Sequence, residues 1–134
     1  KMGQTFDKIC VLYPCAPFVS ESDLMRAKHL LEQYDCVIPV VRFDFPPLRS
    51  FEISESKLRY KWPEYEKSRS QDLEELFHDA RQWYFFRNKE QYHESLVKSS
   101  TSPLILETNK VQDIDTISDW KLAELKFQML NERV

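Results

Sequence analysis

Glycine is almost missing from this sequence, since Gly3 is the only one among 134 residues. Ordinary proteins contain about 7% glycine. Loops that bind the phosphates of a nucleotide through backbone N–H groups usually need several closely spaced glycines, because side chains would block the approach. The absence therefore excludes a glycine-rich phosphate loop within these residues.

The sequence also has no long hydrophobic run and few cysteines. No apolar stretch approaches the roughly 20 residues that a helix needs to cross a bilayer, so we expect no membrane partner. The three cysteines, Cys10, Cys15 and Cys36, form no Cys-x-x-Cys pair, and no cysteine–histidine spacing typical of zinc sites recurs. Cys10 and Cys36 lie in apolar runs, which predicts buried free thiols in a reducing cytoplasm.

A strong excess of charge is missing as well. The formal net charge is only −3, which argues against a nucleic-acid-binding surface, and we expect no nucleic-acid partner. Hydrophobic residues make up 42% of the chain and charged residues 31%, as is typical of a globular protein with a core of its own. We therefore expect residues 1–134 to form a single domain.

The first forty residues predict a strand, a helix and a second strand. Residues 9–13 are a short apolar run typical of a strand buried on both faces. Ser20 and Asp23 then offer a capping box for an amphipathic helix. Residues 37–41 form a second apolar run, in which Pro39 indicates an edge strand or a bulge. This order predicts a parallel strand pair joined by a right-handed crossover.

Further elements follow in the second half of the chain. Residues 82–86 and 103–106 have the composition of two more strands. Thr116, with Asp119 three residues later, approximates a capping box for a last helix. The whole pattern predicts an α/β fold in which a sheet is flanked by helices.

The stretch from residue 42 to residue 69 differs from the rest because its aromatic side chains alternate with charged ones. Residues 51–53 and 58–62 within it read as two strands of a hairpin or arm. Such an aromatic arm is compatible with a dimer surface, with an anion-binding site, or with an ordinary amphipathic ribbon.

Two carboxylates stand one residue apart just before the last helix. Positions i and i+2 of an extended segment point to the same side, so Asp113 and Asp115 can converge on one point. A carboxylate pair of this kind suits Mg²⁺, which usually also takes substrate phosphates as ligands. The alternative is that acidic residues simply stabilise the start of a helix. That alternative explains Asp119 best, is possible for Asp115, and explains Asp113 poorly because it lies too far from the helix.

Nucleophilic catalysis has little support in the sequence. Cys15 lies between prolines near the end of a strand, but no histidine is tied to it, and a structural thiol is the commoner reading. His78 is followed by Asp79, whose carboxylate could orient the imidazole. A local turn or a solvent-facing role is the better explanation of that pair.

Three segments, taken in order, resemble the acylneuraminate cytidylyltransferases, and within them most closely the branch that acts on pseudaminic acid. They are the sequence LYPCAPF at residues 12–18, RSQDL at 69–73 with FHDA at 77–80, and VQDIDT at 111–116. Together the motifs span most of the chain. The last two in combination are the more specific part of the resemblance.

The resemblance implies a nucleotide-diphospho-sugar transferase-like (Rossmann-like) mixed sheet flanked by helices, with a β-hairpin dimerisation arm at about residues 43–68. The implied substrates are CTP and a nonulosonic acid, and the implied partner is a second copy of the chain. Asp113 and Asp115 match the carboxylates that hold Mg²⁺ (or Mn²⁺). The motif residues implied to contact the substrates are Tyr13, Cys15, Ala16, Arg69, Gln71, His78 and Asp79.

The sequence departs from that family in informative places. The family's glycine-rich loop for CTP is absent, and Arg81 stands where relatives usually carry glycine. Cys15 and Glu74 also replace a usual hydroxyl residue and a usual proline. We therefore expect the C-terminal portion of a cytidylyltransferase domain, inactive by itself, with no residue assigned as general base. The alternatives are a non-catalytic dimerisation or binding module of the same fold and a cytidylyltransferase for another keto sugar acid.

Overall fold

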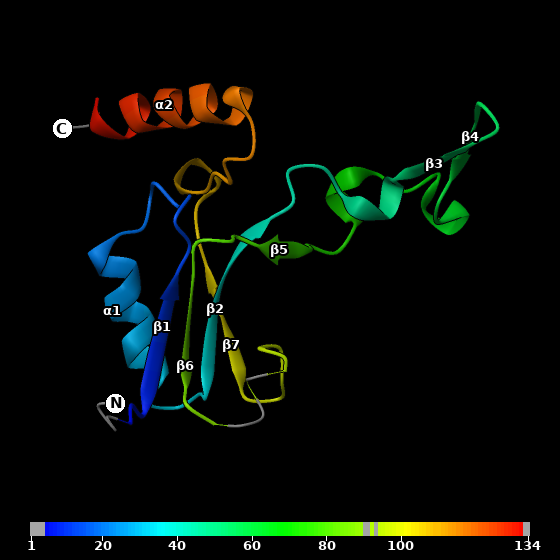
Figure 1. Ribbon diagram of the computed structural model, residues 1–134. Coiled ribbons are helices and arrows are strands. Elements are labelled where there is room, and N and C mark those ends of the chain that lie inside the picture. Colours follow the sequence, from blue (N-terminus) through cyan, green and yellow to red (C-terminus); the bar gives the residue numbers. More distant parts are fainter. Residues whose placement is uncertain (1–4, 90–91, 93, 133–134) are drawn as a thin grey trace. The chain divides into compact units, whose positions relative to one another are not determined.

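A computed structural model describes residues 5–89, 92 and 94–132 (Figure 1). The contacts of the chain group it into two compact units. Unit 1 combines Lys1–Val41 with Asp79–Val134, and unit 2 contains Arg42–His78. The arm predicted at residues 43–68 lies within unit 2.

The centre of unit 1 is a mixed sheet, which confirms the predicted α/β class. Strand β6 (Trp83–Arg87) pairs antiparallel with both β1 (Lys8–Leu12) and β2 (Cys36–Arg42). Strand β7 (Thr101–Ile105) pairs with β2 in parallel (Figure 1). The chain passes from unit 2 into unit 1 within a short strand, β5 (Phe77–Asp79).

The first strand differs from its prediction in two ways. Strand β6 lies between β1 and β2, so these two strands share a direction but do not pair. Strand β1 is also not buried on both faces, because four of its five residues are exposed, among them Leu12 at 54%. In the described chain it is an edge strand, paired with β6 alone. An apolar run predicts that a strand forms, but the position of that strand in the sheet depends on pairings with residues far away in the sequence.

Pro39 lies in a central strand rather than at an edge. Strand β2 has neighbours on both sides, and Pro39 is fully buried. The antiparallel pairing with β6 covers only Cys36 and Val37, so that ladder has ended before the proline, which has no N–H to donate. The Pro39 carbonyl still accepts a hydrogen bond from the Ala80 N–H at 3.0 Å.

Helix α1 (Glu21–Leu30) packs against the sheet and closes the main core. Its N-cap is Ser20, as predicted, and the Ser20 hydroxyl accepts a hydrogen bond from the Asp23 N–H at 3.2 Å, which is one of the two bonds of a capping box. The core is formed by side chains from α1 and the strands: Ala27, Leu31, Val37, Val41, Ala80, Trp83, Leu104 and Leu106. Cys36 is buried as predicted, but Cys10 is exposed because it lies on the edge strand.

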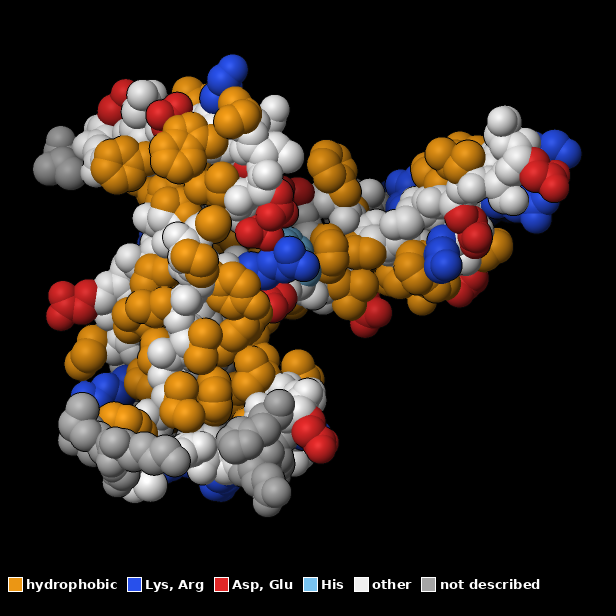
Figure 2. Space-filling model, in the orientation of Figure 1, with side chains coloured by type: hydrophobic (Ala, Val, Ile, Leu, Met, Phe, Trp, Pro, Cys, Tyr) orange, Lys and Arg blue, Asp and Glu red, His pale blue; other side chains and the backbone are white. Residues whose placement is uncertain are grey.

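The last helix, α2 (Ile117–Asn131), begins at the predicted capping box. The Asp119 carboxylate accepts hydrogen bonds from Thr116 and from the Asp115 N–H, and these bonds lower the pKa of Asp119. Asp119 is therefore part of the cap. Of the apolar side chains in α2, Ala123 is buried, whereas Trp120 is 56% exposed, and hydrophobic side chains are visible over this helix in Figure 2. No helix in the described residues is long and apolar enough to cross a membrane.

Unit 2 contains the predicted hairpin. Strands β3 (Phe51–Ser54) and β4 (Lys57–Tyr60) pair antiparallel, and the two residues of the turn, Glu55 and Ser56, both have positive φ (50° and 60°). Tight hairpin turns need this backbone conformation to follow the twist of the strands, and here it is adopted without glycine. The prediction of a hairpin is thus confirmed.

Candidate active site

Three stretches that are distant in sequence meet at one cavity of unit 1. The cavity has a volume of about 410 Å³. One stretch follows β1, the second runs from the end of β5 into β6, and the third precedes α2. The lining residues are Tyr13, Pro14, Cys15, Asp79, Arg81, Tyr84, Asp113, Ile114 and Asp115. Five of these residues (Tyr13, Cys15, Asp79, Asp113 and Asp115) were predicted site residues, so the fold brings together parts of all three motifs.

The two carboxylates of the acidic pair both face this cavity. Asp113 Oδ2 accepts a hydrogen bond from Arg81 Nη1 at 2.9 Å, in an ion pair whose side chains are both partly exposed. The cap of α2 is formed by Thr116 and Asp119 rather than by Asp115. Helix capping therefore does not account for either member of the pair, and both line the cavity.

Asp79 is held by two donors from its own neighbourhood. Its Oδ1 accepts a hydrogen bond from the Arg81 N–H at 2.8 Å, and its Oδ2 accepts one from the Tyr84 hydroxyl. The ring of Tyr13 meets that of Tyr84 edge to face, with 5.5 Å between centroids. Burial, followed by the hydrogen bond to Asp79, raises the pKa of Tyr84 well above its usual value, so this phenol remains a donor. Sequence reasoning missed Tyr84, because an aromatic strand gives no sign of which ring faces a site.

Arg81 has an unusual backbone conformation for its residue type. Its φ is 50°, which lies in the left-handed region that favours glycine. This geometry explains why a glycine suits the same motif position. The hydrogen bond and charge of Asp113, with smaller contributions from the charges of Asp115 and Asp79, raise the pKa of the Arg81 guanidinium. Arg81 thus lies in the cavity as a fixed positive charge, paired with one of the predicted metal ligands.

The remaining predicted residues are placed as follows. Ala16 is half-buried in the loop after β1 and is not among the residues that line the cavity. Arg69, Gln71 and His78 belong to unit 2. Within that unit, Arg69 forms two hydrogen bonds with the carboxylate of Asp72, at 2.8 and 3.1 Å.

Gln71 lines a separate cavity of about 430 Å³ that is formed entirely by unit 2. The imidazole of His78 packs against the ring of Phe43, with 4.7 Å between centroids. The predicted site residues therefore fall into two groups, one in each unit.

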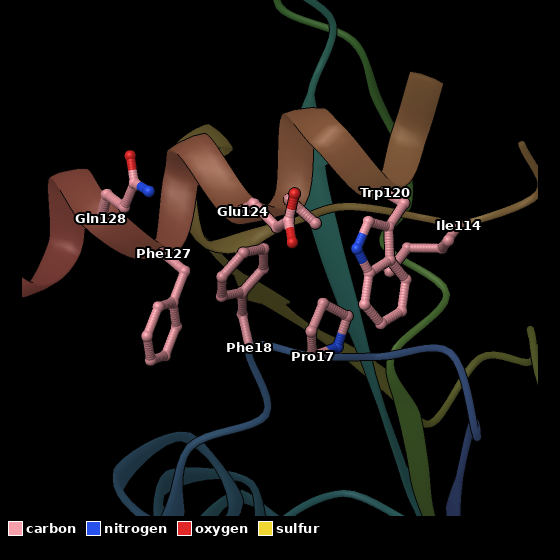
Figure 3. Close-up of a pocket in the computed structure, with 8 residues that line it drawn as sticks. Pro17, Phe18, Ile114, Trp120, Glu124, Phe127 and Gln128 are labelled. Carbon is pink, nitrogen blue, oxygen red and sulfur yellow. The ribbon is translucent and has the colours of Figure 1, made fainter. Parts of the chain in front are cut away.

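A second groove of unit 1 lies beside the acidic pair. It has a volume of about 440 Å³ and runs between the loop after β1 and helix α2. Figure 3 shows Pro17 and Phe18 beneath the helix, with Trp120 and Phe127 projecting toward them. Ile114 lines both this groove and the first cavity, so the two are adjoined by the segment that carries the two aspartates.

The carboxylates that line the cavity suit a metal ion that shares its ligands with a substrate better than a metal ion held by the protein alone. Within the described residues, no group of three or more His, Cys, Asp or Glu side chains is arranged to hold a metal ion. A zinc or calcium site of the usual kind takes at least three such ligands from the protein. Mg²⁺, in contrast, is commonly held by one or two carboxylates together with water and substrate phosphates. Asp113 and Asp115 fit that second type.

Comparison with known proteins agrees with the motif resemblance. No family model matches the chain. Two proteins of Campylobacter jejuni, of serotypes O:2 and O:23/36, are both named pseudaminic acid cytidylyltransferase and are 34% and 33% identical to it. Each match covers 97% of this chain. The chain is a relative of the pseudaminic acid cytidylyltransferases.

The extent of the match is as informative as the name. The chain spans 58% of the length of the two Campylobacter cytidylyltransferases. A Helicobacter pylori protein, whose name combines pseudaminic acid cytidylyltransferase with a UDP-sugar hydrolase, is 27% identical over 96% of this chain and 25% of its own length. The relationship to pseudaminic acid cytidylyltransferases thus extends over nearly every residue described above.

Proposed function

We propose that this chain provides the acceptor side and the metal carboxylates of a cytidylyltransferase that joins CMP to a nonulosonic acid, with pseudaminic acid as the first candidate. The names of the relatives support the reaction class. The structural observation that carries the proposal is the cavity of unit 1, in which Tyr13 and Asp79 lie beside Asp113 and Asp115. Three motifs that are far apart in sequence meet there.

The proposed reaction is a single displacement at phosphorus. The anomeric hydroxyl oxygen of the sugar acid attacks the α-phosphorus of CTP, and the bond from that phosphorus to the bridging oxygen breaks, so that pyrophosphate leaves. The hydroxyl proton is released to a base that we do not assign. When bound by Asp113 and Asp115, Mg²⁺ would neutralise charge that develops on the phosphates. Arg69, with Gln71 and His78, is proposed to bind the acceptor, because a guanidinium pairs well with a carboxylate.

The assay that tests this function is pyrophosphate release from CTP in the presence of Mg²⁺ and a panel of keto sugar acids. These residues contain no glycine-rich phosphate loop, so we expect no measurable release by the chain alone. A form of the protein that also contains such a loop should release pyrophosphate, fastest with pseudaminic acid. Rapid turnover by the chain alone would show that the division of the site is wrong, and preference for another acid would reassign the acceptor.

A second candidate function is a non-catalytic module of the same fold. The observation in its favour is the ion pair between Arg81 and Asp113, which places a protein cation where the metal is proposed to bind. In that case the acidic pair would be purely structural. Metal affinity separates the two candidates, since Asp113→Asn should weaken Mn²⁺ binding only if the carboxylate is a ligand.

The hairpin of unit 2 is the proposed dimerisation surface. Residues opposite each other in an antiparallel pair lie on the same face of the ribbon. The pairs Phe51–Tyr60 and Ile53–Leu58 therefore form one apolar face, while Glu52 and its neighbours form a charged face. Ile53 is 77% exposed and Leu58 61% exposed, so a second copy of the ribbon could bury this face.

A charge on that face should prevent dimer formation. We expect Ile53→Asp to convert the protein from a dimer to a monomer, because an aspartate buried without a partner is strongly unfavourable. Glu52→Lys, on the opposite face of the same strand, is the matched control and should leave the dimer intact. Light scattering coupled to size-exclusion chromatography measures both. An unchanged mass for Ile53→Asp would place the interface elsewhere.

A further inference from the structure

Arg81 brings a positive charge to a point where negative charge converges. Its Nη1 lies 2.9 Å from Asp113 Oδ2, and its backbone N–H donates to Asp79 Oδ1 at 2.8 Å. Asp115 also lines the same cavity and contributes to the electrostatic environment of the guanidinium. The arginine is thus anchored at both ends, by its backbone and by its side chain, to carboxylates of the candidate active site.

Stability does not explain why an arginine is present at this position. A residue with a Cβ is disfavoured at a φ of 50°, whereas glycine adopts this conformation freely. The other two non-glycine residues with positive φ in the described chain, Glu55 and Ser56, form a hairpin turn that requires it. Arg81 instead lies in the connection between β5 and β6, outside any such hairpin pair of the described strands.

The ion pair gives little stability in return. The side chains of Arg81 and Asp113 are 60% and 36% exposed, and water screens pairs of this kind so effectively that they contribute little to folding. Glycine would therefore suit the fold at least as well as arginine. What arginine adds is a tethered cation in direct contact with one of the two aspartates that face the cavity.

We propose that Arg81 is a built-in counter-ion that occupies the Asp113 carboxylate until a divalent cation displaces it. This inference rests on the proposed function, because it requires Asp113 to be a metal ligand. Metal and guanidinium compete for the same carboxylate oxygen, so Arg81 weakens metal binding in the resting site. It also keeps Asp113 oriented toward the cavity in the absence of the metal. Arg81 is thus a positioning residue that sets the concentration at which the site is loaded.

Mn²⁺ binding provides a test that does not depend on turnover. Free Mn²⁺ is followed by electron paramagnetic resonance during titration of the chain without nucleotide. Removal of a unit charge next to a ligand at a partly exposed site should tighten binding of a divalent cation about five- to tenfold in Arg81→Gln. Arg81→Gly should show the same increase in Mn²⁺ affinity. Because glycine is not disfavoured at positive φ, this variant replaces Arg81→Gln in the test if the glutamine variant folds poorly. Arg26→Gln removes another arginine–aspartate pair, on α1, in which the arginine is exposed and the aspartate is buried, and should have no effect on Mn²⁺ binding.

Asp113→Asn separates failure of this inference from failure of the proposed function. If Asp113→Asn weakens Mn²⁺ binding but neither Arg81 variant tightens it, the counter-ion role is wrong and the metal site stands. If Asp113→Asn leaves Mn²⁺ affinity unchanged, or no variant binds Mn²⁺, the metal site itself is wrong and the inference fails with it. Tighter binding by Arg81→Gln and an unchanged affinity for Arg26→Gln would support the proposal.

Discussion

Asp113→Asn is expected to slow pyrophosphate release from CTP by at least about a hundredfold in a form of the protein that carries out the reaction. Even groups that only support a metal ligand typically change affinity or activity about 10- to 100-fold, and Asp113 is proposed to bind the metal directly. The asparagine has the same shape but no charge, so it keeps the packing and loses the strong attraction for Mg²⁺. The measurement is the rate of pyrophosphate release at saturating CTP and acceptor.

Asp119→Asn is the matched control for that variant. Asp119 lies in the same segment, but its carboxylate accepts the capping hydrogen bonds at the start of α2. We expect this variant to keep its turnover at a temperature at which it remains folded. An Asp113→Asn variant that retained activity within about threefold of the parent, a change of less than 1 kcal/mol in activation free energy, would remove Asp113 from the metal site.

Trp83→Ala should have the largest effect on stability, with a loss of about 3–5 kcal/mol in the free energy of unfolding. Trp83 is completely buried and belongs to the core cluster between α1 and the sheet. A domain of ordinary stability has only about 5–15 kcal/mol in total. Denaturation by urea, followed by far-UV circular dichroism, should therefore show a much lower midpoint or a chain that is already unfolded.

Trp120→Ala is the control, because it removes the same side chain from an exposed position. Trp120 is 56% exposed on α2, so little apolar surface returns to water when it is removed. We expect a shift of less than about 1 kcal/mol, which is typical of surface positions. Equal losses for the two tryptophans would mean that the assigned core is wrong.

Local signals in the sequence were sufficient for the two long helices, the hairpin and most of the strands. Both helices begin at the predicted caps, Ser20 and Thr116, because a cap involves only residues within one turn of each other. The hairpin of unit 2 formed where alternating residues predicted it. Strands also formed at the predicted apolar runs, because the side chains of such a run favour burial in a sheet whichever strands become its neighbours.

The order of the strands in the sheet could not be predicted from local sequence patterns. The run at residues 9–13 became an edge strand, and Pro39 lies in a central one, because β6 inserts between β1 and β2. That insertion depends on pairings across more than forty residues of chain, such as Cys36 with Phe86. Local composition does not encode such pairings.

The candidate site was likewise predictable only in part. The i, i+2 spacing identified Asp113 and Asp115, and the motifs identified Tyr13 and Asp79, all of which line one cavity. The roles of Arg81 and Tyr84 depend on contacts that form only in the folded chain. Arg81 and Asp113, for example, are 32 positions apart in sequence and meet through a backbone conformation that is unusual for arginine.

The most direct test of the account is a crystal structure of the protein with Mn²⁺ and CTP, in which the anomalous signal locates the metal. We predict a Mn²⁺ peak within coordination distance of the Asp113 and Asp115 carboxylates, with phosphate oxygens among its ligands and the Arg81 guanidinium moved away from Asp113. A metal bound elsewhere, with the pair between Arg81 and Asp113 intact, would contradict the proposed active site.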